Sequence, residues 1–322
     1  MSTLICGSIA YDTIMVFRDR FQNHILPDKL HILNVAFLVP DMRREFGGCA
    51  GNIAYSLRML GGDPLIMATV GDDHAPYSER LEKLGLTQRH VRRVSGTYTA
   101  QAFITTDIDD NQITAFHPGA MNHSHENRVT DALRNAGDSG GRNHGVTHGI
   151  VAPDGREGML QHAREFHESG VPFIFDPGQG LPMFSGEELF DFVRKADYVT
   201  VNDYEAEMLQ ERTGETIESL AKLVQAFVVT LGARGAVVYT ERGQIDIPSV
   251  KAAAIVDPTG CGDAFRAGLL YGLAAGMDWP TTGRLASLLG SMKIAHRGGQ
   301  NHNYSRDEIG ERYYASFGTR IW

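Results

Sequence analysis

One short segment in the C-terminal third of the chain combines two glycines with a carboxylate where an apolar helix begins. It reads Asp-Pro-Thr-Gly-Cys-Gly-Asp from 257 to 263, and the residues after it predict a helix from Asp263 to Ala275. Such a turn aims unpaired backbone N–H groups at one point, and the helix dipole adds positive potential there. We therefore expect an anion hole made by Gly260, Cys261 and Gly262.

The carboxylate of Asp263 at the rim of this anion hole indicates the reaction. A carboxylate repels phosphate, so Asp263 is badly placed as a phosphate ligand but well placed to take a proton from an attacking hydroxyl. The segment therefore predicts phosphoryl transfer to an alcohol. The alternative is that Gly260 and Gly262 shape a tight turn and that Asp263 caps the helix.

Composition narrows the class of protein. The 322 residues, 42% of them hydrophobic, are enough for one large α/β domain. The net charge of -9 argues against a nucleic-acid groove, which needs a basic stripe. The three cysteines are odd in number and form no disulfide framework, and we find no signal peptide or membrane span. These features predict a cytoplasmic protein with neither nucleic-acid nor membrane partners.

Short apolar runs alternate with longer helical patterns along most of the chain, which is typical of a largely parallel sheet covered on both faces. The expected strands are Leu4–Ile9, Leu65–Val70, Val146–Ala152, Pro172–Asp176, Tyr198–Val201 and Phe227–Leu231. The expected helices are Asn52–Leu60, Arg156–Ser169, Glu187–Ala196, Asp203–Thr213, Ile217–Ala226 and Thr281–His296. Ligands of such folds bind at the carboxyl ends of the strands.

Three segments do not follow this alternation. Residues 17–44 and 98–116 have an alternating, extended character without βα units, so they predict either a separate small sheet or hairpins at the sheet edge. Residues 137–141 read Gly-Asp-Ser-Gly-Gly, like a hydrolase motif, but they follow a predicted helix end rather than a strand. We therefore expect a loop there and no nucleophilic Ser139.

The segment at 257–263 resembles the C-terminal signature of the ribokinase (PfkB) family of carbohydrate and nucleoside kinases, which has the form Asp-Thr-x-Gly-Ala-Gly-Asp. This chain carries Pro258 and Thr259 in place of Thr-x and Cys261 in place of Ala. The resemblance covers essentially the whole chain. It implies a single domain over 1–322 with a ribokinase-like three-layer α/β/α sandwich, a central mostly parallel sheet, and a small β lid formed by about 13–46 and 97–117.

The family's N-terminal signature is similar to Gly47-Gly48-Cys49-Ala50-Gly51-Asn52. Glycines allow the backbone to approach a sugar, and Asn52 offers a donor and an acceptor to vicinal hydroxyls; the alternative is a helix start with Asn52 facing solvent. The resemblance makes Gly47 and Gly48 the lid hinge. It also makes Asp12, which follows Ser8 in the first strand segment, the acceptor for two sugar hydroxyls, unless Asp12 is a solvated turn residue.

The resemblance further implies an ATP site. Asn202 and Glu205 match an Asn-x-x-Glu pattern that holds hydrated Mg²⁺ and phosphates, although the same pair makes a capping box. The loop at 230–235, with Thr230, Gly232 and Gly235, would reach the ATP phosphates, although alone it predicts a hairpin. The adenine would lie between the segment before Asp257 and the helix ending near His296. No Walker-type P-loop is present.

Family members often hold a monovalent cation beside the anion hole, with carbonyls of the motif and of a loop like 297–300 as ligands. Asp257 and Thr259 match the motif side, so potassium is a candidate cofactor beside ATP and Mg²⁺. His296 and His302 are expected to be surface or hydrogen-bonding groups rather than transition-metal ligands.

The aromatic character of the lid segment favours a nucleoside substrate. Phe103 and Phe116 would stack on a purine, unless both are plain lid core. The segments 7–12 and 43–52 look especially like bacterial adenosine and broader purine nucleoside kinases.

The predicted reaction is transfer of a phosphoryl group from MgATP to the 5′-hydroxyl of adenosine, inosine or guanosine. The alternatives are a kinase of ribose, fructose or a related sugar, and a non-catalytic nucleoside-binding regulator. The protein is expected to be a monomer or a lid-mediated homodimer.

Overall fold

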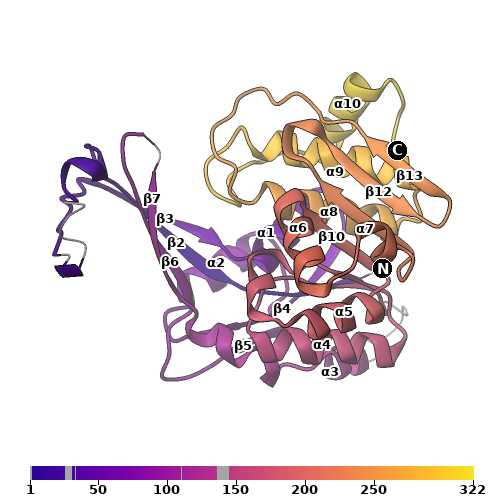
Figure 1. Ribbon diagram of the computed structural model, residues 1–322, viewed down its shortest axis with the longest axis horizontal. Coiled ribbons are helices and arrows are strands. Elements are labelled where there is room, and N and C mark those ends of the chain that lie inside the picture. The colour runs from indigo at the N-terminus through magenta and orange to yellow at the C-terminus, as the bar shows by residue number, and fades with distance from the viewer. Residues whose placement is uncertain (1, 26–30, 33, 110, 136–144) are drawn as a thin grey trace.

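The computed structural model describes residues 2–25, 31–32, 34–109, 111–135 and 145–322. A nine-stranded sheet in the order β13-β12-β11-β10-β9-β8-β1-β4-β5 forms its centre (Figure 1). The sheet is mostly parallel, and β12 runs antiparallel to both of its neighbours, β11 and β13. Its strands are β1 (Ser2–Cys6), β4 (Asp63–Val70), β5 (His90–Arg93), β8 (Val146–Val151), β9 (Phe173–Phe175), β10 (Tyr198–Asn202), β11 (Ala226–Thr230), β12 (Ala236–Thr240) and β13 (Gly243–Ile247).

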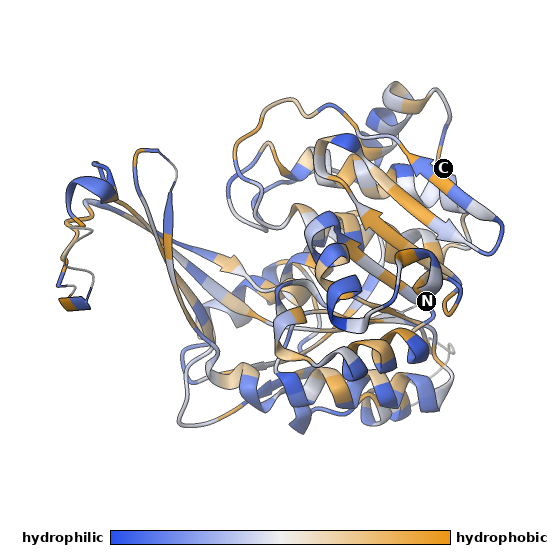
Figure 2. Ribbon diagram, viewed as in Figure 1, coloured by the Kyte–Doolittle hydropathy of each residue, from blue (hydrophilic) through white to orange (hydrophobic). Residues whose placement is uncertain are grey.

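Helices cover both faces of this sheet, because neighbouring strand residues point in opposite directions. Ile5 belongs to one buried cluster, with residues of α1, α8 and α9, whereas Leu4 and Cys6 belong to a second, with residues of α4 and α5. Figure 2 shows the apolar strands between these layers. The helices are α1 (Cys49–Met59), α2 (Ala75–Lys83), α3 (Val129–Asn135), α4 (Arg156–Ser169), α5 (Gly186–Lys195), α6 (Asp203–Thr213), α7 (Ile217–Ala221), α8 (Cys261–Ala274), α9 (Trp279–Lys293) and α10 (Arg306–Phe317).

The predicted three-layer α/β/α order is therefore confirmed, with local corrections. The first strand ends at Cys6 and not at Ile9, because the chain turns there toward the second sheet. The helix predicted from Ile217 to Ala226 ends at Ala221, because Ala226 already begins β11. Strands β5, β12 and β13 and helices α2 and α10 were not among the elements predicted from the sequence.

A four-stranded second sheet, in the order β3-β2-β6-β7, projects as an arm from one end of the main body (Figure 1). Its strands are β2 (Ala10–Val16), β3 (Asp41–Gly47), β6 (Ala100–Thr106) and β7 (Gln112–His117). We call this sheet the lid. The expectation of extended structure throughout 17–44 was wrong, since regular pairing lies in β2 and β3 and a 3₁₀ turn occupies Phe21–Asn23.

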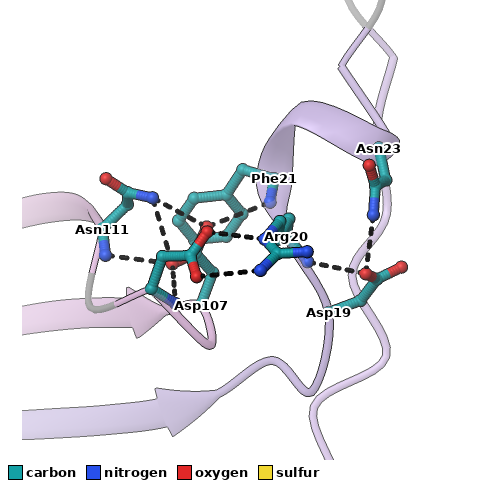
Figure 3. Close-up of polar contacts among 7 residues, drawn as sticks. Asp19, Arg20, Phe21, Asn23, Asp107 and Asn111 are labelled. Carbon is teal, nitrogen blue, oxygen red and sulfur yellow. Dashed lines mark hydrogen bonds and ion pairs between the residues drawn. The ribbon is translucent and has the colours of Figure 1, made fainter.

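The tip of the lid is held together by one buried carboxylate. Asp107 is 4% exposed and accepts hydrogen bonds from the backbone N–H groups of Phe21 (3.1 Å) and Asn111 (3.0 Å) and from the Asn111 amide (Figure 3). Arg20 pairs with Asp109 at 2.7 Å beside it. Because Asp107 joins the β6–β7 hairpin to the 3₁₀ turn, the segments at the tip of the lid are fixed to one another.

Two further expectations concern absent features. Within the described ranges, each helix is too short or too polar to reach across a bilayer. The loop expected at 137–141, with Ser139, lies outside the described residues; the helix expected before it is present as α3.

Candidate active site

A cavity of about 990 Å³ opens at the carboxyl ends of β10 and β11, beside the start of α8. Its wall is formed by residues of several segments that are far apart in the sequence. The predicted residues that line it are Asn202, Glu205, Thr230, Gly232, Gly235, Gly260, Cys261, Gly262 and Asp263. The structure thus brings the predicted ATP and catalytic residues together at one place.

Asp263 is joined to the predicted sugar-binding segment by a short chain of hydrogen bonds. The Asn52 amide donates to Asp263 Oδ2 at 2.8 Å, and Gln300 Nε2 donates to Asn52 Oδ1 at 3.1 Å. Gln300 also contacts the Tyr77 hydroxyl at 2.6 Å. Asn52 is 4% exposed, so the alternative in which it faces solvent was wrong. Neither Gln300, which orients Asn52, nor Tyr77, which contacts Gln300, was predicted to have this role.

Burial makes the Asp263 carboxylate a stronger base than an ordinary aspartate. Desolvation raises its pKa to about 6, the Asn52 hydrogen bond and the nearby Arg266 oppose the rise, and Asp176 adds to it. A carboxylate with this pKa is ionised at neutral pH and accepts a proton more readily than an exposed one. The group is suited to general base catalysis near pH 7.

The turn before α8 has a conformation that favours glycine. Gly260 lies at φ 79°, in the left-handed region, and immediately precedes the helix. The Cys261 N–H donates to the Pro258 carbonyl at 3.1 Å, so the prediction that it helps to form the anion hole is corrected. Among the described residues, the N–H groups of Gly260 and Gly262 have no such internal bond and can face an anion.

A buried ion pair below the anion hole was not predicted. Arg266 makes a bidentate contact with Asp176, through Nε at 3.0 Å and Nη2 at 2.9 Å, and its side chain is only 7% exposed. Its Nη2 also lies 3.9 Å from a Glu205 oxygen. The feature that could have revealed the ion pair is a lone arginine among apolar residues of α8, one turn after Asp263.

Asn202 and Glu205 form the capping box that the sequence left open as an alternative. The Glu205 N–H donates to Asn202 Oδ1 at 2.7 Å, and the Asn202 N–H donates to Glu205 Oε2 at 2.8 Å. Burial raises the pKa of Glu205, with Asp176 adding to the rise and Arg266 opposing it. Both residues also line the cavity, so capping fixes the carboxylate at its wall and leaves one oxygen available there.

The predicted hairpin at 230–235 is present, since β11 and β12 are antiparallel and joined by this turn. The turn also lines the cavity, so the segment can be a hairpin and still reach the ATP phosphates. Ala252, Ile255, Gly290 and Ile294 line the same cavity on the side of α9, where the adenine was expected.

The predicted sugar side lies at the base of the lid. Asp12 is partly buried, and burial, with Asp257 and Glu45 nearby, raises its pKa to about 6. An added Cβ on Gly47 would lie 2.4 Å from Asp12 Oδ2, and Gly48 has φ 87°, so both positions need glycine. Ser8 is 6% exposed and its hydroxyl accepts the Cys49 N–H at 3.2 Å, so it supports the start of α1.

The two lid phenylalanines lie on opposite faces of the lid. Phe116 pairs with Ala102, which pairs with Asp12, and residues directly opposite each other on paired strands share a face. Phe103 pairs instead with Thr13 and Ala115, on the other face. Both rings are exposed, so neither is plain lid core. Phe116 remains a candidate for stacking on a base, but the prediction for Phe103 is corrected.

The predicted cation site at Asp257 does not fit a monovalent metal ion. The ammonium of Lys293 donates to the Asp257 carbonyl at 2.7 Å and to the His296 carbonyl at 2.9 Å. Both Asp257 carboxylate oxygens accept backbone N–H groups, from Thr259 and Gly298. His296 and His302 are hydrogen-bonded to Tyr304 and Ser56, as expected, and the described residues contain no cluster of three metal-binding side chains.

The fold and the cavity together define a phosphotransferase of the ribokinase-like class, and comparison with known proteins identifies the family. The model of the pfkB family of carbohydrate kinases matches residues 9–306, and the chain belongs to this family. The resemblance drawn from its motifs is therefore confirmed, and the protein is a kinase.

Known relatives support a finer comparison. The nucleoside kinase of Methanocaldococcus jannaschii is 30% identical over 281 residues, which cover 87% of this chain and 89% of that protein. The solved structure of Burkholderia thailandensis nucleoside kinase in complex with inosine is 52% identical, covers 99% of both chains and has a TM-score of 0.86. Thermotoga maritima ribokinase, at 22% identity and a TM-score of 0.79, shares the fold.

Proposed function

We propose that the protein transfers the γ-phosphoryl group of ATP to the 5′-hydroxyl of a purine nucleoside such as adenosine, inosine or guanosine. The observation that carries this proposal is the contact between Asn52 and Asp263, which joins the sugar side of the site to a base beside the nucleotide cavity. The similar Burkholderia thailandensis enzyme has been solved with inosine and with ADP-inosine. This enzyme and the relatives from Methanocaldococcus jannaschii and Methanothermobacter thermautotrophicus are named nucleoside kinases, which favours a nucleoside over a free sugar.

The proposed reaction is a direct in-line displacement. Asp263 takes the proton of the 5′-hydroxyl, and the oxygen attacks the γ-phosphorus while the bond to the β-phosphate oxygen breaks. The N–H groups of Gly260 and Gly262 and the Arg266 guanidinium stabilise the charge on the transferred group. Asn52 orients Asp263, and closure of the lid excludes water as a competing acceptor.

The acidic wall of the cavity fits Mg²⁺ held through water. Mg²⁺ usually keeps several water ligands and is bound by one or two carboxylates together with substrate phosphates. Glu205, whose position is fixed by the capping box, would hold a water of such an ion, with Asn202 beside the phosphates. When bound, the ion supplies charge neutralisation on the β- and γ-phosphates.

The pH dependence of turnover should reflect Asp263. The base works only when ionised, so kcat is expected to fall about tenfold per pH unit below about 6, the pKa that burial gives this carboxyl. Because Asp12 has a pKa of about 6 as well, kcat/KM for the nucleoside should fall more steeply than kcat. Initial rates between pH 5 and 8 measure both profiles. A flat kcat over this range would contradict the assignment of Asp263.

Replacement of Asp12 by asparagine should weaken nucleoside binding selectively. Hydrogen bonds to a charged group contribute about 1.5–3 kcal/mol, which corresponds to a rise in KM for the nucleoside of about 10- to 150-fold. The KM for ATP should not change, since Asp12 lies outside the nucleotide cavity. Steady-state kinetics with each substrate varied in turn test this, and an equal rise in both KM values would count against the assignment.

The localisation and assembly belong to the same proposal. A cytoplasmic location is supported by the free thiols of Cys6, Cys49 and Cys261.

The lid face opposite Asp12 exposes Met42 (70%) and Phe103 (40%), which supports pairing of two copies through the lids rather than a monomer. Sedimentation analysis distinguishes the monomer from this homodimer.

A panel of acceptors tests the proposed function. The purified chain is assayed with MgATP and adenosine, inosine, guanosine, ribose or fructose, and ADP release is measured. Faster turnover of at least one purine nucleoside than of either sugar is expected. Preference for ribose or fructose would make the protein a sugar kinase, and nucleoside binding without ADP release would make it a non-catalytic regulator.

A further inference from the structure

Lys293, the last residue of α9, is completely buried beside the turn that carries the anion hole. Lysine is almost never fully buried without partners, because its ammonium is strongly hydrated in water. Burial lowers the pKa of Lys293, and Cys261, Asp257 and Asp263 oppose this shift. The ammonium of Lys293 therefore lies near the proposed base and the anion hole. The proposed mechanism gives Lys293 no role.

The ammonium joins two loops that border the site. It donates to the carbonyl of Asp257, in the segment that leads into α8, and to the carbonyl of His296, in the segment that follows α9. The same two segments are also connected by the Asp257 carboxylate, which accepts the Gly298 N–H at 2.8 Å, and by the Asp257 N–H, which donates to the Ile294 carbonyl at 3.1 Å. The position of Gly260, three residues after Asp257, depends on these contacts.

The ammonium of Lys293 contacts two backbone carbonyls, which are ligands of the kind that a potassium ion would use. The carbonyl of Asp257 belongs to the motif, and His296 immediately precedes the loop 297–300 for which the family resemblance implies a monovalent cation. Carbonyl oxygens bind a cation by its charge, and an ammonium with three N–H donors satisfies them equally. A metal ion at the same carbonyls would lie next to the ammonium in a buried place, where like charges repel strongly.

We infer that Lys293 is a positioning residue whose ammonium replaces the monovalent cation, so that the loop before α8 keeps its catalytic shape without potassium. The fixed charge is part of the chain, and its concentration does not vary with the ionic composition of the solution. The inference rests on the proposed function for its kinetic test alone, because the shape of the loop can also be followed by thermal unfolding.

The experiment compares the full-length wild type with Lys293→Ala in potassium chloride and in tetramethylammonium chloride at equal ionic strength. Melting temperature and kcat with MgATP and inosine are measured in each salt. The wild type should give the same values in both. Lys293→Ala should lose at least about tenfold in kcat in tetramethylammonium, the loss expected when about 1.4 kcal/mol of stabilisation of the transition state is removed. Potassium should restore both kcat and melting temperature, because the ion binds the native state in the space left by the ammonium.

Lys83→Ala is the matched control. Lys83 is an exposed residue at the end of α2, so its removal should leave both measurements and their salt dependence unchanged. A specific rise of wild-type kcat or melting temperature in potassium would overturn the inference, as would a folded Lys293→Ala variant with wild-type kcat in tetramethylammonium. If Lys293→Ala fails to fold, the potassium response of the wild-type melting temperature decides. Absence of any nucleoside phosphorylation by the wild type would instead refute the proposed function and leave the unfolding test valid.

Discussion

Asp263→Asn should lower kcat by about 10²- to 10⁴-fold, the contribution typical of a general base. The substitution removes the proton acceptor but keeps the size of the side chain and its ability to accept the hydrogen bond from Asn52. The KM for ATP and the affinity for the nucleoside should therefore change little. Initial rates for kcat, and calorimetry for nucleoside binding, measure the two effects separately.

The stability of this variant distinguishes lost chemistry from lost structure. Burial raises the folded-state pKa of Asp263 to about 6 from the 3.8 of an ordinary aspartate, so the ionised carboxylate destabilises the folded protein at neutral pH. That cost disappears as the pH falls through about 6 toward 3.8. Asparagine carries no charge, so the melting temperature at pH 7 should stay the same or rise. Asp307→Asn, at an exposed position in α10, is the control for removal of a carboxylate. A variant with wild-type kcat would show that Asp263 is not the base.

The sequence was sufficient to predict those parts of the site that depend on local chemistry. The glycines at 260 and 262, the carboxylate at 263 and the capping pattern at 202–205 are encoded within a few neighbouring residues, and the cavity gathers them at the carboxyl ends of parallel strands. The layer order of the fold followed from the alternation of β-branched runs and helical patterns.

The features that were missed depend on long-range packing. Gln300 reaches Asn52 across 248 residues of sequence, and Arg266 meets Asp176 across 90 residues. Nothing in the neighbourhood of either residue specifies its partner. Lys293 lay inside the helix predicted from Thr281 to His296 and was not singled out, since only the folded chain brings the Asp257 carbonyl to its ammonium. Strand β13 was missed because its exposed positions carry Gly243, Gln244 and Asp246, which are not apolar. The Ala-Val-Val-Tyr-Thr run of β12 does favour a strand, but it was interpreted only as part of a hairpin.

Arg266→Met should lower both stability and turnover. The substitution leaves the Asp176 carboxylate unpaired, and the Asp176 side chain is only 4% exposed. Breaking a buried ion pair in this way costs about 3–5 kcal/mol of stability. The melting temperature, or the free energy of unfolding in urea, should fall accordingly. Turnover should fall as well, because the guanidinium lines the cavity next to Gly262 and Glu205. A variant as stable as the wild type would mean that the pair is not buried as the structure has it.

The double variant Arg266→Met/Asp176→Leu separates the two effects. Replacement of a whole buried ion pair by apolar side chains is often neutral for stability, so the melting temperature should recover. The kcat should not recover if the guanidinium stabilises the transferred phosphoryl group. The acid limb of the kcat profile gives an independent measurement: Arg266 lowers and Asp176 raises the pKa of Asp263, so the limb should move above pH 6 in the single variant and back toward 6 in the double variant. Recovery of kcat together with stability would assign Arg266 to folding alone, since an arginine that acts on the phosphoryl group cannot be replaced by methionine.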